Sequence, residues 1–254
     1  MITLSDQQRA DHQRVALTRF DAALAASPDA PVSFYPGWTV RDLAVHLVAV
    51  HTRAHVAIET AADARPEIAV PVDRDDEPAT LAAAIHAAAD RLDAALDATP
   101  LMSVWAVLPD RHPRAWRRRM MLEATLHGFD AELAAGDPGP VPAEVARDGI
   151  DEFLHLHARK GLATAGLGGI VEVRDDLGSW LLDLASTEVQ RTAAHDAADE
   201  HRPRPGAVVT GTPAALWLWL NRREPVPAAV EVSDHDGTGE RFTDLLDGLN
   251  RPAA

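Results

Sequence analysis

The segment from residue 113 to residue 135 constrains the fold most, because one helical face in it carries both apolar and ionisable side chains. Residues three and four positions apart lie on the same side of a helix, and that side holds Trp116, Arg119, Met120, Glu123, His127 and Asp130. A helix normally buries a face with a Trp and a Met, but charged groups are not buried without partners. The segment therefore needs other helices to cover it and something to neutralise its carboxylates, and a divalent metal is one candidate.

Four further segments repeat apolar residues at helical spacing. We expect these helices over about residues 4–26, 39–64, 81–99 and 142–159. The second of them follows a Pro-Gly turn, Tyr35-Pro36-Gly37-Trp38, and begins at a predicted capping box of Thr39 and Asp42. Together with 113–135, the first three predict an antiparallel four-helix bundle against which the last one packs.

After Lys160 the pattern changes, and the glycine-rich stretch 163–169 is a plausible domain junction. Short apolar or alternating runs predict a hairpin of 170–174 and 180–184 and further strands at 188–194, 207–210 and 230–232. Two helices are expected at 214–222 and 241–249. The expected fold class is α+β. Residues 1–160 form the helical bundle and residues 161–254 a small α+β domain.

Charge and composition exclude several kinds of function. The chain has 24 Lys and Arg against 39 Asp and Glu, a net charge of −15, which argues against nucleic acid or an anionic membrane as partner. It has no stretch of eighteen apolar residues and no signal pattern, so we expect a cytoplasmic protein. We expect this protein to be a monomer or a homodimer. It contains no cysteine, so any thiol chemistry must use a thiol from a second molecule.

A zinc-type catalytic site uses three protein ligands and leaves one position open. Glu123 and His127, four residues apart on one helix, can supply two of them. His46 is the best candidate for the third, since it lies mid-helix at the edge of an apolar stripe, whereas His51 and His55 are expected further round, toward solvent. Such a set suits Zn²⁺ first and Fe²⁺, Ni²⁺ or Mn²⁺ less well.

Two neighbours of this pair have expected supporting roles. Asp130 can hold an imidazole N–H or a metal-bound water, and Arg119 can neutralise the carboxylates or bind a substrate carboxylate. The alternative is structural: a Glu-x-x-x-His pair also arises by chance among twelve histidines, and His46 can be an ordinary hydrogen-bonded histidine of the bundle. No phosphate-binding glycine loop, G-x-S-x-G elbow or H-E-x-x-H motif is present.

The motifs resemble those of the mycothiol-dependent maleylpyruvate isomerase family. Residues 36–43 (PGWTVRDL) followed by His46-Leu47 look like its N-terminal signature, and 118–119 with Glu123, His127 and 130–132 look like its second. Residues 148–153 and 211–223 are similar to later parts of such proteins. This chain departs from the pattern at Leu122, where members commonly have His, and near Tyr35, where they often have a cysteine.

The resemblance implies a DinB-like four-helix bundle and a small sterol-carrier-protein-like α/β domain. It implies a divalent metal, usually zinc, at His46, Glu123 and His127, and mycothiol, an actinobacterial low-molecular-weight thiol, as cosubstrate. The expected chemistry is addition of the metal-activated thiol to a small electrophile such as maleylpyruvate, or cis–trans isomerisation of it. Arg119, Arg222 or Arg223 is expected to hold the substrate's acid group.

Three other functions remain open at this point. The chain can be a thiol S-transferase in detoxification or secondary metabolism, in which the thiol stays on the product. It can instead be a non-catalytic protein that binds a metal or ligand, or an inactive structural bundle.

Overall fold

The computed structural model describes residues 4–98, 103–106, 111–158, 161–162, 166–193, 203–223 and 230–249. The chain divides into two compact units, which meet in the sequence between Gly139 and Pro140. The N-terminal unit is helical, and the C-terminal unit combines helices with a five-stranded sheet. The predicted α+β fold class is confirmed.

The described part of the N-terminal unit contains four helices: α1 (Asp6–Ala26), α2 (Val40–Glu59), α3 (Pro78–Ala98) and α4 (Arg114–Ala135). Their starts agree with the sequence signals to within three residues. The second helix ends five residues earlier than expected, and Ala61 just after it has a left-handed backbone with φ of 49°. An L-residue adopts that conformation at helix ends but not within a helix.

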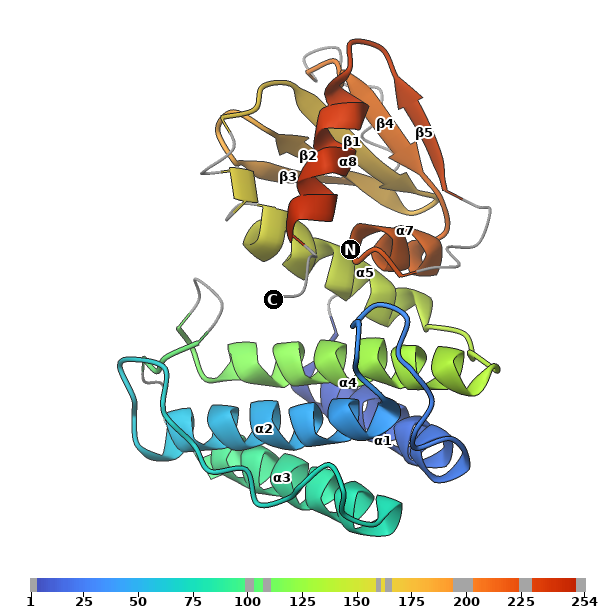
Figure 1. Cartoon of the computed structure of the whole chain (residues 1–254). Helices are drawn as coiled ribbons and strands as arrows, with labels where there is room; N and C mark the ends of the chain where they lie inside the picture. The colour runs from blue at the N-terminus through green and yellow to red at the C-terminus, as the bar shows by residue number, and fades with distance from the viewer. Residues whose placement is uncertain are drawn as a thin grey trace. The chain divides into compact units, whose positions relative to one another are not determined.

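The helices form two parallel pairs that run in opposite directions (Figure 1). Arg114 of α4 pairs with Asp6 at the start of α1, and Glu132 pairs with Arg19 near its end, so α1 and α4 are parallel. Helices α2 and α3 also share a direction, since Leu43 and Leu81 from their first halves lie in one buried cluster, and Ile58 and Leu96 from their last turns lie in another. The predicted antiparallel arrangement therefore holds between the pairs and not within them.

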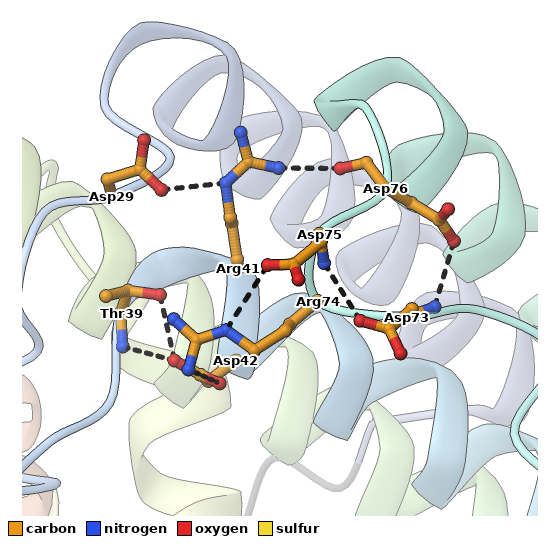
Figure 2. A network of polar contacts seen from close by, with 8 residues as sticks. All are labelled: Asp29, Thr39, Arg41, Asp42, Asp73, Arg74, Asp75 and Asp76. Carbon is orange, nitrogen blue, oxygen red and sulfur yellow. Dashed lines mark hydrogen bonds and ion pairs between the residues drawn. The ribbon is translucent and has the colours of Figure 1, made fainter.

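The long connection from α2 to α3 makes this parallel arrangement possible, because it returns to the start of α2. Figure 2 shows the polar contacts that fix it there. Arg41 of α2 donates to the backbone oxygen of Asp76 at 2.6 Å and to the Asp29 carboxylate at 2.8 Å. Arg74 lies 3.4 Å from the Asp42 carboxylate. The beginning of α2 is thus fixed from both sides.

The C-terminal unit is built on a sheet of order β3-β2-β1-β4-β5. Its strands are β1 (Ile170–Asp175), β2 (Gly178–Asp183), β3 (Val189–Ala193), β4 (Ala207–Thr210) and β5 (Glu231–Asp234). Only β1 and β4 pair in parallel. Helix α8 (Thr238–Leu249) contacts β1, β4 and β5 and crosses the sheet in Figure 1, and α7 (Pro213–Leu220) follows β4 directly.

The fifth helix, α5 (Ala143–Phe153), belongs to the C-terminal unit. That unit begins at Pro140, twenty residues before the boundary after residue 160 that the sequence predicted. It packs on α7, where a Cβ at Gly149 would lie 2.3 Å from the Trp217 ring. A short π-helix, Leu154–Ala158, continues it. Lys160 and residues 163–165, near the expected junction, lie outside the described residues. No helix in the described part of the chain is long and apolar enough to cross a membrane.

Candidate metal centre

The first turn of α2 positions His46. The predicted capping box is present: the Asp42 carboxylate accepts from the backbone N–H and the hydroxyl of Thr39, both at 2.8 Å. These bonds satisfy donors that the start of a helix leaves unpaired. His46 follows Asp42 by one turn, with its imidazole partly exposed.

Helix α4 supplies the other groups, from its middle. Glu123, His127 and Asp130 occupy neighbouring turns of one face, and His127 and Asp130 are buried. Gly128 allows α4 to lie close to α1, because a Cβ at this position would be 3.3 Å from the backbone oxygen of Ala16. This close approach packs α4 firmly against α1.

The structure brings His46, Glu123 and His127 together. One ligand atom from each lies within 4.8 Å of the others, and they form the one such group among the described residues. The Oε2 atom of Glu123 lies 3.1 Å from His127 Nε2 and 3.4 Å from His46 Nε2. Both imidazoles therefore turn the same nitrogen, Nε2, toward one carboxylate oxygen.

Asp130 and Arg119 contact the atoms of His127 and Glu123 that do not face the other candidate ligands. Asp130 Oδ2 lies 3.1 Å from Nδ1 of His127, so Nδ1 can carry the proton and Nε2 keeps its lone pair. The Arg119 guanidinium donates to Oε1 of Glu123, which leaves Oε2 for the imidazoles. Both residues thus lie where the sequence analysis placed them, beside the candidate ligands.

The surroundings of Glu123 and His127 shift the pKa of each group toward its charged form. Burial alone would raise the pKa of the Glu123 carboxyl, but Arg119 and the hydrogen bonds to His127 and His46 outweigh it and hold that pKa well below its usual value. Burial alone would lower the pKa of His127, but Asp130 and Glu123 raise it above its usual 6.5. Without a metal, the cluster therefore favours an ionised Glu123.

The donor set fits a divalent metal. Zinc bonds to nitrogen and oxygen at about 2.0–2.2 Å, so two ligand atoms of a tetrahedral site lie roughly 3.4 Å apart. Glu123 Oε2 lies 3.1 Å from Nε2 of His127 and 3.4 Å from Nε2 of His46, close to this value. When His127 binds a metal through Nε2 it is neutral, and the cation then replaces the imidazolium charge beside Glu123.

One sequence expectation about α2 is wrong. His51 was placed toward solvent, but its side chain is fully buried, and burial lowers its pKa to about 4. Its Nδ1 lies 2.8 Å from the Leu47 oxygen and its Nε2 lies 3.4 Å from Gln13 Nε2 on α1. The imidazole faces the interior because α2 is covered by α1 as well as by α3 and α4.

Arg222 and Arg223 lie in the C-terminal unit, just past α7. Arg222 forms an ion pair with Asp247 of α8, and Arg223 is buried and donates to the backbone oxygen of Asn221 at 2.9 Å. Their predicted role in binding substrate stays a prediction.

Sequence reasoning missed two residues beside the candidate ligands, Tyr35 and Trp38. The Tyr35 ring lies 5.8 Å from that of His127, and the Trp38 ring 5.8 Å from that of His46. The Pro-Gly turn between them was recognised as a turn and as part of the family's N-terminal signature, but neither ring was given a role. The available signal was the pair of aromatic residues that flank it.

Residues 10–132 match a family model described as the mycothiol maleylpyruvate isomerase N-terminal domain. The N-terminal unit belongs to this domain family. The match covers α2 and the three candidate ligands on α2 and α4. The family resemblance indicated by the sequence motifs is therefore confirmed.

Solved structures extend the likeness beyond that domain of the mycothiol maleylpyruvate isomerase family. Similar ones include a crystal structure of the mycothiol-dependent maleylpyruvate isomerase and one of a histidine-to-alanine variant of it. Each is 18% identical and matches over 92% of this chain and 96% of its own, with TM-scores of 0.53 and 0.54 for native and variant. At this identity the likeness shows a shared fold across both units. No match to a curated protein is found.

Proposed function

We propose that this chain is a metal-dependent enzyme that uses mycothiol and acts on a small electrophile such as maleylpyruvate, by thiol addition or cis–trans isomerisation. The observation that carries the proposal is the meeting of His46, Glu123 and His127 in a chain without cysteine. Structural zinc sites are closed by four protein ligands, whereas three leave a position for a ligand from solution. Family membership supports mycothiol as that external thiol.

A divalent metal held there would favour the thiolate form of a bound thiol, because the cation stabilises the negative sulfur. The protein's own residues orient the site. Asp130 holds the His127 ring with Nε2 facing Glu123, and Arg119 keeps one oxygen of Glu123 occupied. The bundle supplies a preformed set of donors, so little ordering is needed when the metal binds.

The fate of the thiol separates two reactions. If it adds to a carbon–carbon double bond and leaves after rotation about that bond, the product is an isomer. If it stays, the product is a conjugate and the enzyme is an S-transferase. The substrate's acid group needs a cation, and we propose Arg119, Arg222 or Arg223 for this role.

Metal analysis tests the centre first. The wild-type protein, loaded with zinc and then desalted, should retain one equivalent, and His46→Ala should retain much less because it removes a ligand. His86→Ala is the matched control, since His86 lies on α3 of the same bundle and pairs with Asp21 instead. Wild-type protein without stoichiometric metal would contradict the proposal.

Activity assays then separate the reactions. Zinc-loaded protein with mycothiol should convert maleylpyruvate to its trans isomer, followed by the change in absorbance, and His46→Ala should not. Conjugation of a generic electrophile without isomerisation would establish the transferase instead. Metal binding with neither activity on a broad panel of electrophiles would favour a non-catalytic binding protein.

A further inference from the structure

The Pro-Gly turn before α2 is built to bring two aromatic rings together. The backbone N–H of Trp38 donates to the oxygen of Tyr35 at 2.9 Å, and Gly37 has φ of 84°. This is a type II turn, with Pro at its second position and Gly at its third. The side chains of its first and fourth residues stack, with ring centroids 4.9 Å apart and planes inclined by 26°.

The loop around the turn is fixed to the bundle at its base. The N–H of Val32 donates to the Trp38 oxygen at 2.9 Å, and the N–H of Val40 donates to the Ala30 oxygen at 3.2 Å. Pro31 and Thr39 form an isolated bridge between these two bonds. Since Val40 begins α2, the stacked rings are held in a defined place relative to that helix.

The two aromatic rings and the imidazoles of His46 and His127 lie in a cycle, each ring next to two of the others. Tyr35 lies beside the His127 ring and Trp38 beside the His46 ring, both with centroids 5.8 Å apart. The two imidazoles meet edge to face at 4.9 Å. An aromatic wall, Tyr35 and Trp38, thus borders both nitrogen donors of the candidate metal centre.

Exposure indicates the side from which a solute arrives. The His46 side chain is 29% exposed, against 11% for Glu123 and 4% for His127. A molecule from solution therefore reaches this group on the His46 side, where Trp38 lies. Tyr35 and Trp38 are themselves only partly buried, so some ring surface remains available to it.

Resting on the proposed function, we propose that the aromatic wall, Tyr35 and Trp38, selects a substrate with a flat, conjugated group next to its acid group. Flat π systems stack on Tyr and Trp rings, whereas puckered saturated groups of the same charge and similar size do not. Tyr35 and Trp38 are thus specificity-determining residues.

A matched pair of small acids tests this without turnover. Benzoate and cyclohexanecarboxylate carry the same charge but differ in planarity, and calorimetry gives the affinity of each for zinc-loaded protein. The wild-type protein should bind benzoate roughly three- to tenfold tighter, as expected for one aromatic stacking contact. Trp38→Leu and Tyr35→Leu should each lose most of this preference, and Tyr35→Phe should keep it.

Trp105→Leu is the control, because Trp105 is an aromatic residue of the same unit that contacts Trp116 instead, and it should keep the preference. Equal affinities in wild type, no binding of either acid, or a preference that survives both leucine variants would overturn the inference. Zinc content is measured on the same samples. Missing zinc in wild type overturns the proposed metal centre, whereas full zinc with equal affinities overturns only the aromatic wall.

Discussion

Acid should unfold the N-terminal unit partly through His51, the imidazole buried between α1 and α2. Its pKa is lowered to about 4 in the folded protein because burial removes the charged form from water. In the unfolded chain it returns to about 6.5. Between pH 6.5 and about pH 4 the unfolded state therefore binds a proton at His51 that the folded state does not bind. The free energy of unfolding decreases as the pH is lowered through this range.

The size of this effect follows from the shift. A difference of about 2.5 pKa units corresponds to about 3 kcal/mol of unfolding free energy, at about 1.4 kcal/mol per unit. His51→Gln removes the titrating group, so between pH 7.5 and pH 4 the wild type should lose about 3 kcal/mol more than this variant. At pH 7.5 the variant itself should be about 1–3 kcal/mol less stable, because the bonds to Leu47 and Gln13 change.

Urea titrations followed by far-UV circular dichroism at several pH values measure this difference. A chelator in every sample removes the contribution of metal release, which also varies with pH. His235→Gln serves as the control, because it removes an imidazole that is exposed in the folded protein instead of buried. If wild type and His51→Gln lose stability in parallel as pH falls, the reasoning from burial is refuted.

Three other substitutions have defined outcomes. Asp130→Asn should weaken zinc binding about 10- to 100-fold, measured by competition with a chelating dye, because the bond that orients His127 is weakened; unchanged affinity would show that this contact is not needed. Gly149→Ala should cost about 1–3 kcal/mol in urea, since its Cβ would overlap the Trp217 ring, and a neutral result would mean that α5 shifts freely. Glu132→Gln should cost about 1–2 kcal/mol, because it breaks the two-bond pair with Arg19; no loss would show that solvent already screens the pair.

The local elements were predictable because their signals lie within a few residues of one another. The capping pair Thr39 and Asp42 marks the start of α2, and Thr212 with Pro213 marks the start of α7. Helical and alternating patterns located all four bundle helices and the five strands. Helix ends were less certain, as at Ala61, because a left-handed residue that is not glycine has no sequence signal.

The sequence alone determined the spacing that places Glu123 and His127 on one face of α4, and the absence of cysteine that makes any thiol external. Only the tertiary structure decided that His46 reaches them, that His51 is buried instead of exposed, and that α5 belongs with α7. Spacing along a helix is fixed by its backbone geometry. Contacts between helices depend on the direction and the rotation in which the helices pack. In this bundle the connection from α2 to α3 runs back to the start of α2 and so makes these two helices parallel.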